Sequence, residues 1–226
     1  MTATPAPTTG DVPGTGLTLI GQYDSPFVRR VAVALVQYGL AYRHLPWSVW
    51  ADAERLARYN PLRRVPVLML EDGSVLVESF AILDALDERV PEARALLPRS
   101  GPQRREGLRI AAFAAGLADK AVSLLYEHVL RQPALRNAVW AERCAQQLRD
   151  TLALLERERQ QRPTPFWFGA DLTHADIALA CALRFTREAH PTLVASFGPA
   201  LRAHADRCEA LEVFRAVVQP LTITLD

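Results

Sequence analysis

The order of hydrophobic and polar positions divides the chain into two halves of different character. Up to about residue 90, short apolar runs alternate with segments of helical spacing, in the order strand, helix, strand, helix, strand, strand, helix. The strands are expected at residues 17–20, 40–45, 67–70 and 75–77, and the helices at 25–39, 50–59 and 79–90. This order predicts a compact sheet unit with a right-handed crossover between parallel neighbours.

A β-hairpin over residues 67–77 is the best defined element of this half. The dipeptide Asp72-Gly73 between its apolar runs accepts the positive φ values that a short turn needs. Pro66, just before the first run, removes one backbone donor and constrains its neighbour Val65. The backbone of Val65 can therefore pair with a peptide-like ligand, although an ordinary hairpin that begins with a proline explains the same residues.

Two serines stand where helices are predicted to begin, and free backbone N–H groups at such positions can bind an anion. Ser25 precedes Pro26, and a proline at the first helical position gives up an N–H that has no partner there. Ser79 follows Glu78 and opens the helix that leads away from the hairpin. A capping role alone would also explain both serines.

Beyond residue 90 the strand pattern disappears. Prolines and glycine mark residues 91–102 as a linker, and apolar positions of helical spacing follow through residues 103–226. The second half is therefore predicted to be an all-α bundle. Within it, Thr173 stands three residues before Asp176, which is close to a capping box with Asp where Glu is usual. We interpret this segment as structural.

Composition and charge narrow the function. The chain has 226 residues and a net charge of +1, from 26 basic and 25 acidic side chains. Such a balance creates no long-range field that would favour a nucleic acid or an anionic membrane, so neither is expected as a partner. No apolar run approaches the roughly 20 residues that a membrane span requires.

The cysteines and the first residues of the chain indicate the cellular compartment in which the protein is expected. Three cysteines lie far apart and form no Cys-x-x-Cys pair, which argues against a disulfide framework, a zinc site or a dithiol redox motif. We therefore expect a reducing, cytoplasmic environment and no metal. Residues 1–16, rich in Thr, Pro and Gly, lack the basic start and apolar core of a signal peptide, and we interpret them as a flexible tail.

Four motifs follow one another in the chain, each beside the element that it should border. They are Ser25-Pro26-Phe27, Asn60-Pro61-Leu62 with Val65-Pro66-Val67, Glu78-Ser79, and Thr173 with Asp176. With these motifs, the chain from about residue 17 to residue 218 resembles the glutathione S-transferases. The resemblance implies an α+β thioredoxin-like N-terminal domain over residues 17–90 and an all-helical C-terminal domain over residues 103–226. It also implies a cis peptide bond before Pro66 and a homodimer.

The resemblance further implies a site for glutathione, the co-substrate, built from Ser25, Phe27, Arg64, Val65, Pro66, Glu78 and Ser79. Where many members of the family read Gly-Lys, this chain has Arg63-Arg64 before the valine. The lysine that usually makes a contact with the ligand is therefore replaced here, and Arg64 is the candidate to reach the same carboxylate.

The residue types suit this ligand. Glu78 can pair with the amine of glutathione, and the hydroxyl and N–H of Ser79 can bind its γ-glutamyl carboxylate. Val65 can supply antiparallel backbone bonds to the cysteinyl part. Ser25 can donate its hydroxyl to the sulfur, where the helix dipole also favours a thiolate. Ser25 is thus the predicted catalytic residue, as a stabiliser of the nucleophile and not the nucleophile itself.

Alternatives remain at this stage. Tyr23 is a second candidate for the hydroxyl, and Tyr23, Phe113 and Tyr126 are candidates for the pocket of the second substrate. The absence of a cysteine at position 25 disfavours thiol–disulfide exchange. We predict transfer of glutathione to a small hydrophobic electrophile, as in detoxification. Glutathione-dependent isomerisation or dehalogenation would use the same thiolate, and a non-catalytic binding or regulatory protein could keep the same fold.

Overall fold

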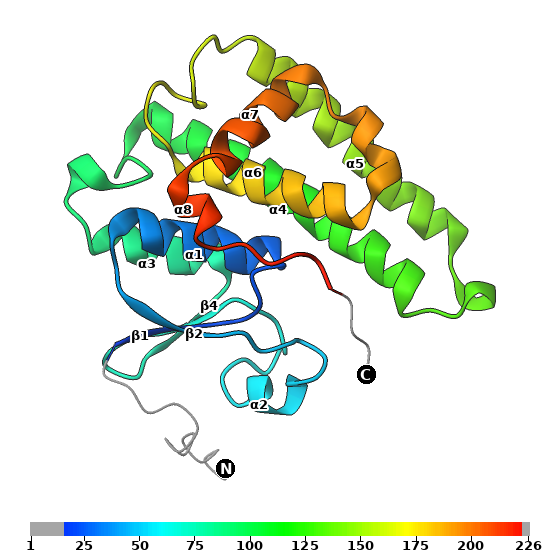
Figure 1. Ribbon diagram of the computed structural model, residues 1–226, viewed down its shortest axis with the longest axis horizontal. Coiled ribbons are helices and arrows are strands. Elements are labelled where there is room, and N and C mark those ends of the chain that lie inside the picture. Colours follow the sequence, from blue (N-terminus) through cyan, green and yellow to red (C-terminus); the bar gives the residue numbers. More distant parts are fainter. Residues whose placement is uncertain (1–15, 223–226) are drawn as a thin grey trace.

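The computed structural model of the protein describes residues 16–222. Apart from Gly16, the tail predicted for residues 1–16 lies outside the described residues. The first part of the described chain folds around a four-stranded sheet, and the second part is helical, as the sequence predicts (Figure 1).

The sheet has the strand order β2-β1-β3-β4. Its strands are β1 (Leu17–Ile20), β2 (Tyr42–Leu45), β3 (Val67–Met69) and β4 (Val75–Val77). β1 pairs in parallel with β2 and antiparallel with β3, and β3 pairs antiparallel with β4. The predicted hairpin is confirmed, with Val67 opposite Val77 and a φ of 84° at Gly73 in the turn. The peptide bond before Pro66 is cis, as the resemblance implies.

Helices cover both faces of this sheet (Figure 1). They are α1 (Pro26–Tyr38), α2 (Ala53–Ala57) and α3 (Ser79–Glu88). Successive residues of a strand point to opposite faces. Leu19 accordingly packs into the core beneath α1 and α3, whereas Ile20 packs with Trp47 and Leu56 on the side of α2. The helix expected over residues 50–59 is thus limited to the five residues of α2.

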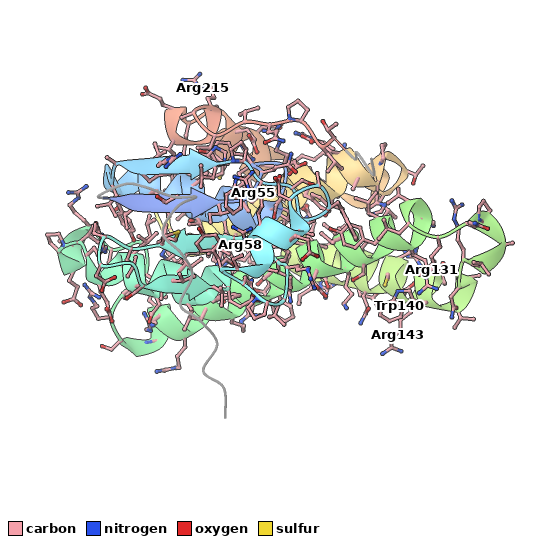
Figure 2. All side chains as sticks on the ribbon, turned by 90° about the horizontal axis from the view of Figure 1, so that it is seen from below. Arg55, Arg58, Arg131, Trp140, Arg143 and Arg215 are labelled. Carbon is pink, nitrogen blue, oxygen red and sulfur yellow. The ribbon has the colours of Figure 1, made fainter. Side chains whose placement is uncertain are left out.

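The second part contains five α-helices among the described residues. They are α4 (Gly101–Val129), α5 (Ala138–Gln160), α6 (His174–Ala189), α7 (Pro199–Glu209) and α8 (Glu212–Arg215). Short 3-10 turns are η1 (Glu92–Arg94), η2 (Pro133–Leu135) and η3 (Pro191–Ser196). Because α4 begins at Gly101, the last two residues of the predicted linker are already helical. Figure 2 shows Arg131, Trp140 and Arg143 at the far end of the α4–α5 pair, away from the sheet.

The central helix α6 is anchored by the predicted capping box. Asp176 Oδ2 accepts hydrogen bonds from the backbone N–H of Thr173 at 2.9 Å and from its hydroxyl. Asp176 Oδ1 accepts a further bond from the N–H of Trp167 at 2.7 Å. The carboxylate is fully buried. The structural interpretation of this segment is confirmed.

A buried hydrogen-bond network joins the two halves. The Tyr38 hydroxyl of α1 donates to Asp87 of α3, and Asp87 Oδ1 lies 2.8 Å from His174 Nε2 of α6. The N–H of Leu96, between the halves, donates to the Tyr38 hydroxyl at 2.8 Å. Burial lowers the pKa of His174, so the imidazole is held neutral. The network fixes how the N-terminus of α6 meets α1 and α3 of the first half.

The three cysteines, Cys144, Cys181 and Cys208, are buried and free. Burial raises the pKa of Cys181 to about 11 and also raises that of Cys208. These thiols are therefore packed as small apolar groups and not as reactive thiolates. Within residues 16–222, every helix is too short or too polar to cross a membrane.

Candidate active site

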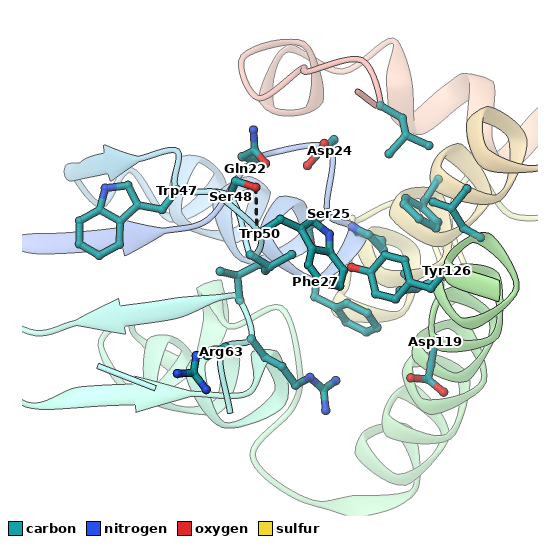
Figure 3. Close-up of a pocket in the computed structure, with 18 of the residues that line it drawn as sticks. Gln22, Asp24, Ser25, Phe27, Trp47, Ser48, Trp50, Arg63, Asp119 and Tyr126 are labelled. Carbon is teal, nitrogen blue, oxygen red and sulfur yellow. Dashed lines mark hydrogen bonds between the residues drawn. The ribbon is translucent and has the colours of Figure 1, made fainter. Parts of the chain in front are cut away.

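A cavity of about 530 Å³ opens beside the N-terminus of α1, between the first half of the chain and helices α4 and α6 (Figure 3). Its walls also include the loops before α2 and β3 and the segment after α8. Of the residues predicted for the site, five line this cavity: Ser25, Phe27, Arg64, Val65 and Tyr126. The structure therefore brings the N-terminus of α1 and the cis-proline loop to one cavity.

Ser25 is the N-cap of α1. Its Oγ accepts a long hydrogen bond of 3.4 Å from the N–H of Val28, and the side chain is only half-buried. Since the oxygen acts as the acceptor in this bond, the hydroxyl hydrogen is available to a group in the cavity. Pro26 occupies the first helical position, and α1 ends at Gly39 with a φ of 69°. Both ends of the helix were predicted from these residues.

The loop that leads to Val65 is organised by Asn60, which is almost fully buried. Its Nδ2 donates to the carbonyl of Arg64 at 2.8 Å, and its Oδ1 accepts from the N–H of Leu62 at 3.1 Å. The ladder pairing of β3 with its neighbours begins at Val67. Val65, which lines the cavity, thus stands just before the paired part of the strand.

Gly21 makes the close approach of the two cavity loops possible. Its φ is 128°, and a Cβ at this position would lie 2.5 Å from Val28 Cγ2 and 2.8 Å from Val65 Cβ. Any other residue would therefore push the loop after β1 away from Val65. Gly21 was not among the predicted site residues, although a glycine directly after a strand is a signal for a close backbone approach.

Glu78 and Ser79 lie at the start of α3 and are not among the residues that line the 530 Å³ cavity. Glu78 has a φ of 67°, a left-handed conformation that is uncommon for this residue type. Its Oε1 lies 3.7 Å from Arg64 Nη1, and both side chains are more than half exposed. Such an exposed pair contributes little stability, so a ligand can compete for either partner.

Ser79, in contrast, is buried, and its Oγ lies 3.5 Å from Arg30 Nη1. Pro66, the remaining predicted residue, holds the turn before β3 and does not line the cavity itself.

Two residues predicted for the second-substrate pocket lie elsewhere. The ring of Tyr23 stacks on His44 with centroids 3.9 Å apart, and its hydroxyl is 2.7 Å from the hydroxyl of Tyr42. Tyr23 is therefore directed toward β2 and does not line the cavity, which corrects its assignment to the pocket and argues against it as the alternative hydroxyl. Phe113 packs against the helical core with Arg109 over its ring, and it too is absent from the cavity wall.

Tyr126 contacts Trp50, which was not among the predicted site residues. Their rings are 5.3 Å apart in an edge-on arrangement (Figure 3). Burial raises the pKa of the Tyr126 hydroxyl, so it stays protonated at neutral pH. Trp50 comes from the loop before α2 and Tyr126 from α4, so this contact spans the cavity between the two halves.

The segment after α8 closes another side of the cavity. Gln219 Oε1 accepts from the N–H of Tyr23 at 3.0 Å, and the N–H of Leu221 donates to Glu188 Oε2 at 2.8 Å. Leu221 and the next residue line the cavity. A segment without periodic pattern is thus tied both to the loop after β1 and to α6.

Basic and acidic side chains line different sides of the cavity. Arg63 and Arg64 lie on the side of the cis-proline loop, whereas Asp24 and Asp119 lie on the side of α1 and α4. Burial raises the pKa of Asp24. Among the described residues, the structure has no group of three His, Cys, Asp or Glu side chains that could hold a metal ion.

Comparisons of the sequence with known families agree with this architecture. The family description "Glutathione S-transferase, N-terminal domain" matches residues 19–94, and "Glutathione S-transferase, C-terminal domain" matches residues 138–207. The GST-like protein YibF of Escherichia coli is 30% identical over 176 residues, which cover 74% of this chain and 80% of that protein. Maleylacetoacetate isomerase of Mus musculus is 30% identical over 66% of this chain and 68% of its own length.

Solved structures are similar over almost the whole chain. A glutathione S-transferase of Methylobacterium radiotolerans, in complex with glutathione sulfonate, has a TM-score of 0.84 and 28% identity over 93% of this chain and 98% of its own. A glutathione transferase family member of Pseudomonas fluorescens, with bound glutathione, has a TM-score of 0.78 and 32% identity over 91% of this chain and 100% of its own. The chain therefore belongs to the glutathione S-transferase family.

Proposed function

We propose that the protein transfers the thiolate of glutathione to a small apolar electrophile. The observation that carries the proposal is the position of Ser25, whose hydroxyl stands at the N-terminus of α1 and on the wall of a largely apolar cavity. A thiolate beside that hydroxyl is stabilised by the hydrogen bond and by the helix dipole. Attack of the sulfur on carbon then needs no metal and no separate general base.

The rest of glutathione is placed by the residues around Ser25. The backbone of Val65 pairs with the cysteinyl part, Glu78 binds the amine, and Ser79 binds the γ-glutamyl carboxylate at the N-terminus of α3. Arg64, which can leave its exposed contact with Glu78, binds a carboxylate of the ligand. Support comes from the two similar structures above, one in complex with glutathione sulfonate and one with bound glutathione.

The acceptor occupies the remainder of the cavity, against Phe27, Trp50, Tyr126 and Leu221. This wall is mostly apolar and aromatic, which suits a flat, uncharged electrophile. The carboxylate of Asp24 on the same side disfavours an anionic acceptor.

A second candidate is glutathione-dependent isomerisation. Two relatives are named maleylacetoacetate isomerase, the mouse protein above and one from Pseudomonas aeruginosa that is 39% identical over 37% of this chain and 41% of its own length. The same glutathione thiolate would be the nucleophile in that reaction. An acid substrate would need cations beside the acceptor, whereas Arg63 and Arg64 lie on the glutathione side, so we favour conjugation.

The proposal also includes a homodimer, a cytoplasmic location and a role in detoxification. These three parts rest on membership of the family alone. Size-exclusion chromatography with light scattering measures the oligomeric state, and a monomer at micromolar protein concentration would contradict the homodimer.

Calorimetric titration with reduced glutathione, together with the thiolate absorbance of the complex from pH 5 to 9, tests the chemistry. S-methylglutathione, which has no titratable thiol, is the control for the absorbance. Binding with a thiol pKa well below the usual value of about 8.5 is expected. Binding with an ordinary thiol pKa would mean that Ser25 acts only as a helix cap. Absence of binding would mean that the protein does not catalyse a glutathione-dependent reaction.

A further inference from the structure

Two neighbouring arginines of α1, Arg29 and Arg30, are buried to a similar degree, with 2% and 3% of their surface exposed. Arg29 is fully paired. Its guanidinium donates to the two carboxylate oxygens of Glu209 at 2.6 and 2.7 Å and to the carbonyls of Val217 and Phe214 at 3.0 and 3.2 Å. This is the arrangement expected of a structural buried cation.

Arg30 has no comparable partners. Within residues 16–222 it forms no ion pair with a carboxylate, and its Nε has no hydrogen-bond partner. Its Nη1 reaches only the hydroxyl oxygen of Ser79, at 3.5 Å, and its guanidinium lies 4.3 Å from the centroid of the Phe80 ring. Burial lowers the pKa of Arg30 to about 10, so the side chain still carries its charge at neutral pH.

The two carboxylates that border the same cavity as Arg30 form no ion pair with it. Arg30 borders a cavity of about 310 Å³ together with Asp84 and Asp87. Asp84 is paired with Arg104 at 2.9 Å. Asp87 Oδ1 accepts from Tyr38 and lies 2.8 Å from His174 Nε2, whereas Asp87 Oδ2 has no hydrogen-bond partner and lies beyond ion-pair distance of Arg30. A buried cation without a counter-ion is costly, so an anion that arrives nearby is strongly favoured.

Ser79 is the place where such an anion can arrive. It is the first residue of α3, a helix of 10 residues, so its backbone N–H and the helix dipole favour negative charge. Because Arg30 donates to Ser79 Oγ, the hydroxyl hydrogen of Ser79 is directed away from Arg30 and can be donated to the ligand. The positive charge of Arg30 lies directly behind that bond.

We propose that Arg30 is a positioning residue for the γ-glutamyl carboxylate of glutathione, which it binds through Ser79 and attracts as the missing counter-ion. This inference rests on the proposed function. It assigns to Arg30 a role in affinity for the ligand, and to Arg29, one residue earlier, a role in stability only.

The test compares two ligands, and the wild type with two variants, by calorimetric titration. The ligands are glutathione and 4-aminobutyryl-Cys-Gly, which is glutathione without the α-carboxylate. Arg30→Met is expected to bind glutathione about ten-fold more weakly than the wild type, equivalent to about 1.4 kcal/mol. Its affinity for the shortened ligand should be unchanged. Arg30→Lys, which restores the charge, should recover part of the loss.

Stability supplies the readout that separates the two arginines. In the absence of ligand, Arg30→Met should unfold at or above the temperature of the wild type, because an unpaired buried charge has been removed. Arg29→Met should unfold at a clearly lower temperature, because it removes the two-fold ion pair with Glu209 and the bonds to the carbonyls of Val217 and Phe214. If Arg30→Met does not fold, Arg30→Gln provides the same comparison, since it keeps a donor toward Ser79 without the charge.

The outcomes are distinct. Failure of the wild type to bind glutathione would refute the proposed function. Binding by the wild type, with equal affinity in Arg30→Met or Arg30→Gln, would overturn the role of Arg30. An equal loss for both ligands would also overturn it, because the effect would then not involve the γ-glutamyl carboxylate.

Discussion

Ser25→Ala is the substitution that tests the proposed chemistry most directly. It removes one hydroxyl and leaves the N-terminus of α1 in place. A hydrogen bond to a charged acceptor contributes about 1.5–3 kcal/mol. One pKa unit corresponds to about 1.36 kcal/mol, so the pKa of the bound thiol should rise by about 1 to 2 units.

The effect on rate follows from the thiolate fraction. With a thiol pKa near 6.5, about three quarters of the bound glutathione is ionised at pH 7, and with a pKa near 8 only about one tenth is. Turnover of an aryl halide at pH 7 should therefore fall about eight-fold in the variant. At a pH well above both pKa values, the two rates should converge.

The assay is the pH dependence of kcat/KM with a generic aryl halide, measured for the wild type, Ser25→Ala and Tyr23→Phe. Tyr23→Phe is the matched control, because it removes a hydroxyl that bonds to Tyr42 and faces away from the cavity. Its profile should match that of the wild type. The long 3.4 Å bond from Val28 indicates that the Ser25 cap contributes only about 0.5 kcal/mol to the stability of the fold. Unfolding of the Ser25→Ala variant therefore does not explain a loss of rate of about eight-fold. An unshifted profile for Ser25→Ala would refute the reasoning.

Three further predictions concern binding and stability. Glu78→Gln should weaken glutathione binding by about 1.5–3 kcal/mol, since a charged partner of the ligand amine is lost, and calorimetry that finds an unaltered Kd would contradict this. Burial lowers the pKa of His204 to about 3, so only the unfolded chain binds a proton between about pH 6.5 and 3. The free energy of unfolding in urea should therefore fall as the pH falls, by about 2 kcal/mol at pH 5 relative to pH 7. A free energy of unfolding that does not change with pH would contradict this prediction. Gly198→Ala would place a Cβ 2.1 Å from Glu156 Cδ and should destabilise the protein by about 1–3 kcal/mol in thermal unfolding, whereas an unchanged Tm would show that Glu156 moves freely.

The elements that the sequence predicts best are those with local signals. Asp72-Gly73 lies in the turn of the hairpin, Ser25 begins α1, and Gly39 ends it. Each of these depends on backbone preferences within a few residues. The capping box at α6 was found for the same reason.

The composition of the cavity wall was less accessible to sequence reasoning. Trp50 was expected at the start of a helix but stands in the loop before α2, and Leu221 lies in a segment without periodicity. Only the tertiary packing brings both to the cavity that Tyr126 also lines. Tyr23 and Phe113 are of suitable type, but packing directs them away from the cavity, Tyr23 toward β2 and Phe113 into the helical core. Residue type can nominate a pocket residue, whereas the direction of its side chain depends on neighbours that are distant in sequence.

The attachment of the segment after α8 bears on how the protein should be handled in the laboratory. Leu221 forms part of the acceptor wall and is held there by its hydrogen bond to Glu188. A truncation before this residue, or a fusion partner that pulls the segment away, removes wall from the acceptor side and leaves Val65 and Ser79 untouched. Preparations that differ only at the carboxyl end should therefore share one affinity for glutathione and rank electrophiles in different orders.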